Sequence, residues 1–152
     1  MRAYLLEQPN RPYGADDLRR LGVLHWRLPL SGSEMEIERI KRERGYVDQD
    51  EVSLSPETPN LDAICAKFDQ EHYHTLDEVR FVVDGAGIFD VRDAGDQWVR
   101  IEVDAGDLII IPARAYHRFY LTSSKNIRCV RLFLNNEGWA PLYREAAAAE
   151  GR

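Results

Sequence analysis

Cysteine, long apolar runs and clustered basic residues are all scarce in this chain of 152 residues. Its two cysteines, Cys65 and Cys129, are too few and too far apart for a disulfide framework or a zinc ribbon. Both lie among apolar neighbours, so we expect two buried thiols. The longest apolar run, residues 108–112, has the length of a strand, whereas a membrane span needs roughly 18 to 20 apolar residues. We therefore expect neither a disulfide scaffold nor a membrane protein.

Positive charge is also too dispersed for a nucleic-acid-binding surface. The formal net charge is −6, and the one basic run, IKRERG, falls in a helix-like segment with Glu36, Glu38 and Glu43. A helix face of mixed charge is usually solvated, so nucleic acid is not an expected partner. The first residues, MRAYLLEQPN, contain no apolar stretch long enough for a signal peptide. A cytoplasmic location is the default expectation.

Capping signals predict helices in the first sixty residues, which otherwise look irregular. Ser33 and Glu36 have the spacing of a capping box, and Gly45 is a suitable C-terminal stop, so we expect one helix over 34–44. Asn60 is a plausible cap for a second helix, LDAICAKF. A short helix is expected at LRRLG, followed by the strand-like segment VLHWRL.

From Glu71 onward the pattern changes to short strands separated by turn signals. We expect strands near residues 72–83, 87–92, 97–103, 107–112, 116–122 and 127–134. The turns are predicted at DGAG, DAGD and the Ala-Gly pair before the fourth strand. Six β segments in succession indicate an antiparallel sandwich or barrel and not a βαβ fold. The expected fold class is mainly β with a few N-terminal helices (α+β).

A histidine pair in the first of these strands is the strongest sign of chemistry. In a strand, residues two apart point to the same face, so His72 and His74 project together. The same parity adds Glu78 and Arg80 to that face, whereas Asp77 points away. Two imidazoles and one carboxylate are three of the ligands of a non-haem Fe(II), Ni(II) or Mn(II) site.

The fourth ligand should come from a neighbouring strand, and His117 is the candidate. Phe119 shares its face and would form an apolar wall beside the metal. A histidine pair of this spacing is by itself more often part of a surface strand. Here Glu78 at matching parity, Gly85 seven residues later, and GDLIIIP before His117 favour the metal site.

Other chemistries have less support in the sequence. Ser123 and Ser124 lack a nucleophile elbow, and neither cysteine has a histidine nearby. The glycines of DGAGIF lie between two expected strands and not between a strand and a helix, so a dinucleotide-binding loop is not expected.

Several segments together resemble a known family. EHYHTLDEVRFVVDGAGIFDVRD and DQWVRIEVDAGDLIIIP resemble the two cupin motifs. With YHRFYL, with RLF followed by Trp139, and with LRRLGVLHWRL and RERGY, they resemble the acireductone dioxygenases of methionine salvage. The resemblance implies a cupin-type antiparallel β-barrel (jelly roll). We expect one domain over 1–152, with an N-terminal part (1–68), a barrel core (69–136) and a C-terminal tail (137–152).

The resemblance also implies roles for individual residues. The family's metal ligands correspond to His72, His74, Glu78 and His117, which would hold one Fe(II) or Ni(II) per chain. Its substrate-contacting arginine corresponds to Arg80, and its aromatic pocket residues to Phe68 and Phe119. The assignment of Phe68 comes from the resemblance alone. One departure is Pro112-Ala113-Arg114, where the family usually has Pro-Ala-Gly.

The reaction implied by the resemblance is oxidation of 1,2-dihydroxy-3-keto-5-methylthiopentene by O2. Iron would give 4-methylthio-2-oxobutanoate and formate, and nickel would give 3-methylthiopropanoate, formate and carbon monoxide. We expect a monomer whose partners are this small molecule and O2. Two alternatives stay open at this point. One is another metal-dependent cupin dioxygenase or isomerase, and the other is a cupin binding module without catalysis.

Overall fold

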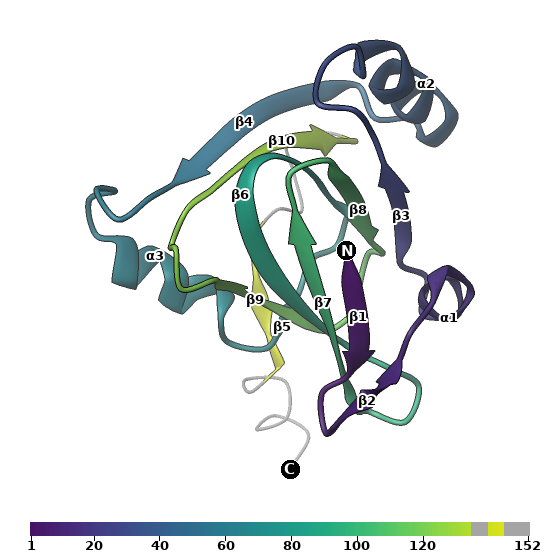
Figure 1. The fold of residues 1–152 in the computed structure, drawn as a ribbon, viewed down its shortest axis with the longest axis vertical. Helices are drawn as coiled ribbons and strands as arrows, with labels where there is room; N and C mark the ends of the chain where they lie inside the picture. The colour runs from purple at the N-terminus through teal and green to yellow at the C-terminus, as the bar shows by residue number, and fades with distance from the viewer. Residues whose placement is uncertain (135–139, 145–152) are drawn as a thin grey trace.

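One long strand, β6 (Glu78–Arg92), belongs to both halves of the β structure in the computed structural model of the chain (Figure 1). The structure describes residues 1–134 and 140–144. The first half of β6 pairs with β8 (Asp107–Ile111) and β10 (Ile127–Phe133). Its second half pairs with β7 (Trp98–Asp104) and β9 (His117–Leu121), and all four pairings are antiparallel. The strand thus passes from one sheet into the other and joins them into a barrel.

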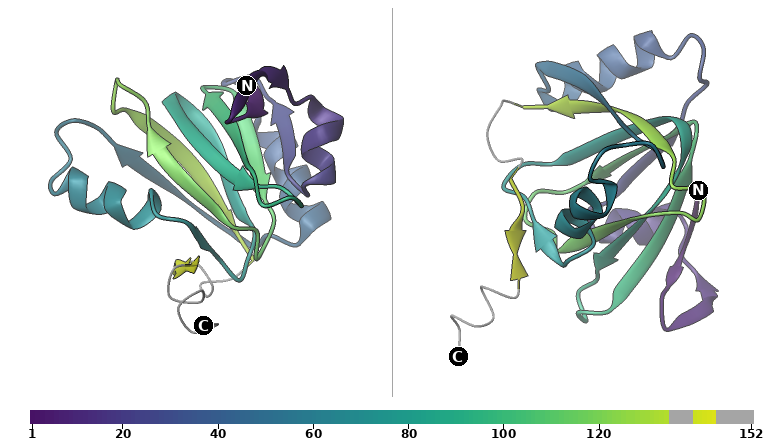
Figure 2. Two further views of the ribbon diagram at one scale, coloured as in Figure 1. Left: turned by 90° about the horizontal axis from the view of Figure 1, so that it is seen from below. Right: turned by 90° about the vertical axis from the view of Figure 1, so that its left-hand side faces the viewer.

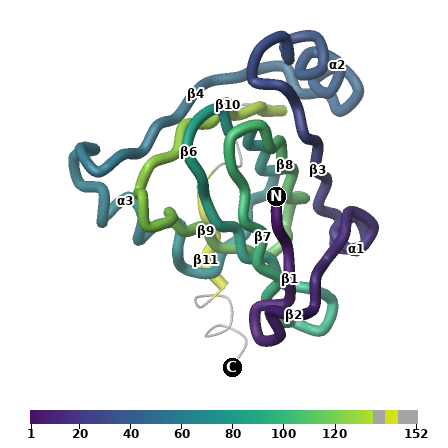
Figure 3. The backbone as a smooth tube through the Cα atoms, viewed as in Figure 1, coloured from purple at the N-terminus to yellow at the C-terminus, as the bar shows by residue number. Residues whose placement is uncertain are grey.

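Shorter strands extend both sheets. The sheet that contains the second half of β6 has the strand order β11-β5-β9-β6-β7-β1-β2. In the other sheet, β4 pairs with β10 at one edge and β3 pairs with β8 at the other. The bounds are β1 (Arg2–Leu5), β2 (Gln8–Pro12), β3 (Leu24–Arg27), β4 (Asp48–Leu54), β5 (His72–Tyr73) and β11 (Leu142–Tyr143). The backbone trace shows the N-terminal part running around the outside of the barrel, from β1 through β3 to β4 (Figure 3).

Three helices among the described residues cover the barrel: α1 (Ala15–Arg20), α2 (Glu34–Arg44) and α3 (Leu61–Phe68). α1 and α3 lie on opposite sides of the barrel (Figure 2). In the described part of the chain, no helix has the length and apolar character needed to cross a membrane.

The core consists of two apolar layers, one on each face of the sheet that contains β8. Ile109 and Ile111 belong to the cluster inside the barrel, whereas Leu108 and Ile110 pack against a cluster that includes Ile40 of α2. All five residues of β8 are buried. A strand covered on both faces needs no polar alternation, which explains the continuous apolar run in the sequence.

The predicted helices are confirmed in place and differ in their caps. α2 spans residues 34–44 and ends at Gly45, whose φ of 78° is left-handed, as the stop signal predicted. The capping box at Ser33 is wrong, because the Ser33 side chain makes no capping hydrogen bond. Its backbone already has helical angles (φ −87°, ψ −2°), whereas a capping residue is normally extended. The LRRLG helix begins earlier than predicted, at Ala15.

Several strand predictions are wrong in detail. The expected strand 72–83 is interrupted at residues 74–77, and the turn expected at Asp84–Gly87 does not form. β6 runs through that position with a register shift between Val82 and Asp84, and the next residue, Gly85, adopts a φ of +79°. The view that the first sixty residues contain little sheet is also wrong, since β1, β2 and β4 lie there. β2 and most of β4 are exposed and polar, so they carry no hydrophobic alternation to reveal them. Trp139 and most of the expected C-terminal tail lie outside the described residues.

Candidate metal centre and active-site pocket

Three buried histidines converge at one end of the barrel. His72 lies on β5, His74 follows that strand, and His117 begins β9, directly opposite His72 in the strand pairing. One ring nitrogen from each histidine lies within 4.8 Å of the other two. The side chains come from two separate segments that the fold brings together.

Hydrogen bonds fix the orientation of each imidazole ring. The Nδ1 atom of His72 lies 2.7 Å from the carbonyl oxygen of Gln70, and that of His117 lies 2.8 Å from the carbonyl oxygen of Ala115. His74 has the same kind of contact, at 3.3 Å, with Ala140. Because a carbonyl only accepts, Nδ1 carries the proton in each ring and the Nε2 lone pair is left for another partner.

Two of the Nε2 atoms lack such a partner among the described residues. Those of His74 and His117 are buried and make no hydrogen bond to the described residues. Buried polar atoms are rarely left unpaired, so an orphaned pair that points to one place indicates a site for a bound species. Burial lowers the pKa of His72 to about 4 and also lowers the pKa of His74. Both rings are therefore neutral at pH 7, the form that binds a metal ion.

Glu78, the first residue of β6, adds a carboxylate to the three imidazoles. Its Oε2 lies 3.2 Å from Nε2 of His117, and its Oε1 lies 3.5 Å from Nε2 of His74. Burial opposes ionisation of Glu78, but the Arg80 guanidinium outweighs it and holds the pKa of Glu78 well below its usual range. Three imidazole nitrogens and one carboxylate oxygen fit a divalent transition metal such as Fe(II), Ni(II) or Mn(II).

The route that brings these residues together differs from the predicted one. His72 and Glu78 do not lie on one continuous strand, since β5 pairs with β9 and the start of β6 pairs with β8 of the other sheet. Residues 74–77 cross from one sheet to the other, so the site lies between the two sheets. The four residues grouped by strand parity are brought together as expected. Parity explains why Glu78 and Arg80, which both lie on β6, share a face, but the crossing is what brings them to the histidines.

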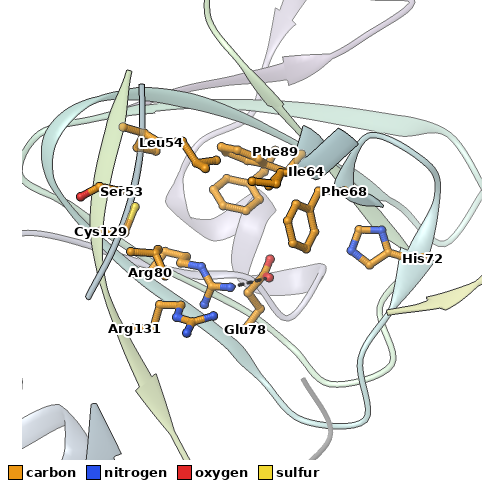
Figure 4. A pocket seen from close by; sticks show the side chains of 13 residues that line it. Ser53, Leu54, Ile64, Phe68, His72, Glu78, Arg80, Phe89, Cys129 and Arg131 are labelled. Atoms are coloured by element: carbon orange, nitrogen blue, oxygen red, sulfur yellow. Dashed lines mark hydrogen bonds and ion pairs between the residues drawn. The ribbon is translucent and has the colours of Figure 1, made fainter. Parts of the chain in front are cut away.

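A cavity of about 330 Å³ opens beside His72 (Figure 4). Its polar end contains His72, Glu78, Arg80 and Arg131, and Nη2 of Arg80 donates to Oε1 of Glu78 over 3.0 Å. The rest of the lining is mainly apolar: Val52, Leu54, Ile64, Phe68, Phe89, Phe119, Ile127 and Cys129, with Ser53. The residues expected at the substrate, Arg80, Phe68 and Phe119, therefore all line one pocket.

Sequence reasoning missed Arg131 and Cys129 as pocket residues. Arg131 lies directly opposite Arg80 in the β10–β6 pairing, and its Nε donates to Oδ1 of Asp50 over 2.7 Å. The alternation of Ile127, Cys129 and Arg131 along β10 could have revealed both, because every second residue shares a face.

The expectation of two buried thiols is confirmed for Cys129, and burial raises its pKa to about 11. It is wrong for Cys65, which lies on the surface helix α3 and is only half-buried.

The turn before His117 contains Arg114, at the position where the resembled family usually has glycine. Arg114 has a φ of 69°, which is left-handed and explains why a glycine is common there. Its side chain is exposed, and its backbone N–H donates to the carbonyl oxygen of His74 over 2.8 Å. The turn thus holds the histidine segment through the backbone of Arg114, while the arginine side chain points to the surface.

An antiparallel barrel with three inward-facing histidines and an apolar pocket defines a metal-dependent enzyme of the cupin class. The sequence profile of the ARD/ARD' family matches residues 6–141. The chain thus belongs to the acireductone dioxygenase family.

Relatives over nearly the full length support this assignment. The chain is 45% identical to the acireductone dioxygenase of Heterostelium pallidum over 144 residues, which cover 95% of this chain and 98% of that protein. It is 41% identical to the human acireductone dioxygenase over 147 residues, covering 95% and 82%. Among solved structures, the acireductone dioxygenase of Bacillus anthracis, with a cadmium ion in its active centre, is similar with a TM-score of 0.88. That match has 32% sequence identity and covers 93% of this chain and 97% of the other. The resemblance, the cupin-type fold and the assignment as a metal-dependent dioxygenase are confirmed.

Proposed function

We propose that this enzyme oxidises 1,2-dihydroxy-3-keto-5-methylthiopentene with O2, as a step of methionine salvage. The observation that carries the proposal is the convergence of three buried imidazoles and an ionised carboxylate at the polar end of an apolar pocket. We further propose a single-domain monomer that acts in the cytoplasm and binds no nucleic acid.

The proposed metal ligands are His72, His74, Glu78 and His117, holding one Fe(II) or Ni(II). Each histidine presents Nε2 because its Nδ1 is bonded to a backbone carbonyl. Three neutral ligands and one carboxylate leave a divalent site with a net charge of +1. A metal ion bound there would supply Lewis acidity that favours the enediolate form of the substrate.

Arg80 has two proposed roles at the polar end of the pocket. Its guanidinium stays protonated, and its side chain is only 19% exposed, so its charge is weakly screened. It bonds Glu78 through Nη2 and the carbonyl oxygen of Val79 through Nη1. These two contacts hold the positive charge beside the proposed metal site, where it would stabilise a deprotonated enediolate.

The apolar part of the cavity suits the methylthioethyl chain of the substrate. Phe68 and Phe119 are the proposed contacts, and Phe119 packs on Phe89 with ring centroids 5.0 Å apart. Aromatic walls on this side would exclude water from an enediolate that reacts readily with O2.

The products are proposed to depend on the metal. With Fe(II) we expect 4-methylthio-2-oxobutanoate and formate, and with Ni(II) we expect 3-methylthiopropanoate, formate and carbon monoxide. Both ions accept nitrogen and oxygen ligands of this kind. Anaerobic reconstitution of one batch of metal-free protein with each ion, followed by substrate, O2 and product analysis, tests this. The same product set with both metals would contradict it, and turnover without O2 uptake would indicate an isomerase.

Two substitutions test the residues. His117→Ala should lower metal content and activity together, and a variant with full metal content and normal turnover would exclude the proposed ligand set. Arg80→Met should keep the metal but lower kcat/KM by about 30- to 1000-fold, from loss of a charge-assisted contact of about 2–4 kcal/mol. An unchanged kcat/KM would reduce Arg80 to a structural role.

A further inference from the structure

Asp77 joins the two chain segments that provide the metal-centre side chains. Its Oδ1 accepts a hydrogen bond of 2.9 Å from the backbone N–H of Ala113, in the turn before His117. A second bond runs beside it, 2.8 Å long, from the N–H of Arg114 to the carbonyl oxygen of His74. The crossing at residues 74–77 is thereby fixed to the turn at residues 112–115.

The other carboxylate oxygen of Asp77 is bound from the N-terminal part of the chain. Oδ2 accepts from the hydroxyl of Tyr46 at 2.9 Å and from Nη2 of Arg44 at 3.2 Å. Arg44 also donates through Nε to the Tyr46 oxygen at 3.0 Å. Tyr46 is 4% exposed and packs in the apolar cluster that includes Ile40, so it anchors the carboxylate to the end of α2.

The position of Asp77 gives these contacts a consequence for the metal centre. It directly precedes Glu78, so its bonds fix the backbone from which the Glu78 carboxylate projects. Ala115, two residues beyond Ala113, provides the carbonyl oxygen that orients the ring of His117. One carboxylate therefore acts on two of the four proposed ligands while touching neither of them in any recorded contact.

We propose that Asp77 is a positioning residue for the metal centre, anchored by Tyr46 and Arg44. The inference rests on the proposed ligand set and adds a part of the chain that this set does not include. Groups that orient ligands commonly change metal affinity by about 10- to 100-fold when they are altered. Because α2 ends at Arg44, the packing of this helix is linked through Asp77 to the geometry of the metal site.

Asp77→Asn is a near-isosteric test. Both oxygens of the carboxylate accept hydrogen bonds from donors, whereas an amide has one oxygen and one N–H2 group. In Asp77→Asn the N–H2 group therefore faces either the Ala113 N–H or the Arg44 guanidinium, both of which only donate, so one of these two contacts is lost. Tyr46→Phe removes one donor and leaves the buried ring in place.

Asp17→Asn is the matched control. Asp17 also accepts from a backbone N–H, that of Gly14 at 2.9 Å, and from an arginine, Nη1 of Arg20 at 3.1 Å. It lies on α1, on the side of the barrel opposite α3, and makes no recorded contact with the histidine segments.

The experiment measures the unfolding temperature of each metal-free variant, its Co(II) affinity by competition with a chelator, and its visible Co(II) spectrum. Asp77→Asn should bind Co(II) about 10- to 100-fold more weakly, with an altered spectrum. Tyr46→Phe should change the Co(II) affinity and the Co(II) spectrum in the same direction as Asp77→Asn. The double variant should bind Co(II) no more weakly than Asp77→Asn alone. Asp17→Asn should lose stability but keep the affinity and spectrum of the parent.

Two results would overturn the inference. One is a parent-like affinity and spectrum in Asp77→Asn, and the other is an equal loss of affinity in Asp17→Asn, which would indicate general destabilisation. If Asp77→Asn does not fold, Tyr46→Phe is measured in its place, and a parent-like result there overturns the inference. A parent protein that fails to bind Co(II) contradicts the proposed ligand set as well, so the two failures are distinguishable.

Discussion

Gly87 gives the sharpest test of how the pocket wall is built. It lies on β6 beneath the ring of Phe119, and a Cβ atom at this position would lie 2.6 Å from Cε2 and 2.9 Å from Cζ of that ring. The same atom would lie 3.0 Å from Cδ1 of Ile127. Both neighbours line the cavity. Gly87→Ala therefore forces the Phe119 ring to move, and the cavity is the space into which it can move.

The size of the effect follows from this overlap. Extra atoms in a packed interior cost about 1–3 kcal/mol, which in a chain of this length lowers Tm by roughly 3–10 °C. KM for the acireductone should rise several-fold, because the displaced ring narrows the pocket. Metal content should stay the same, since none of the three nearest atoms at Gly87 belongs to a histidine. Calorimetry, metal analysis and O2 uptake measure the three quantities.

Gly95→Ala is the matched control, because a Cβ there would meet only Oδ1 of Asp93, at an ordinary 3.5 Å. It should leave Tm and KM close to those of the parent. A smaller side chain in Gly87→Ala/Phe119→Leu should recover part of the lost stability. Parent-like Tm and KM in Gly87→Ala, or equal losses in Gly95→Ala, would refute the packing argument.

Three further predictions concern the turn, the buried thiol and the metal. Arg114→Gly should raise the free energy of unfolding by up to about 1 kcal/mol, because glycine adopts the left-handed φ of this exposed position without strain. Turnover should stay within a few-fold of the parent. A loss of turnover above about 100-fold would place Arg114 in the active site. The raised pKa of Cys129, about 11 against an ordinary value near 9, means that the unfolded chain ionises first. Stability should fall by about 2–3 kcal/mol as pH rises from about 9 through 11. Urea unfolding should show a smaller loss in Cys129→Ala, and an equal loss would contradict this cause. Chelation should lower Tm and added Ni(II) should restore it, because a ligand that binds only the folded state stabilises it; a Tm indifferent to both would argue against a metal in the folded protein.

The sequence was informative about which residues gather and less so about how. Strand parity grouped His72, His74, Glu78 and Arg80, yet the structure brings them together through a crossing between sheets that no periodicity reveals. Parity also indicated that Asp77 points away from this group. The Asp77 side chain does point away, but its partner Tyr46 could not be predicted, because that contact depends on tertiary packing over a separation of 31 residues.

Edge strands mark the other limit of prediction from sequence. β4 carries Asp48, Asp50 and Glu51 and is mostly exposed, so its strand conformation comes from pairing with β10 and not from apolar alternation. Asp50 also accepts a hydrogen bond from Arg131, which lines the pocket. This contact could not be predicted from the sequence, because it depends on the pairing of β4 with β10. β8, buried on both faces, was by contrast apparent from its apolar run alone.

The long strand β6 has a consequence for how insertions and deletions would act. Straight, its 15 residues would extend about 50 Å, yet Glu78 at its start and Val91 near its end both lie against His117. Its curvature therefore sets how these two positions meet. Removing one residue near Gly85 would shift one half of the strand against the other and turn its side chains to the opposite face. The spacing between Glu78 and Val91 is thus a length constraint on this enzyme, and we expect substitutions in that interval to be tolerated far better than changes in its length.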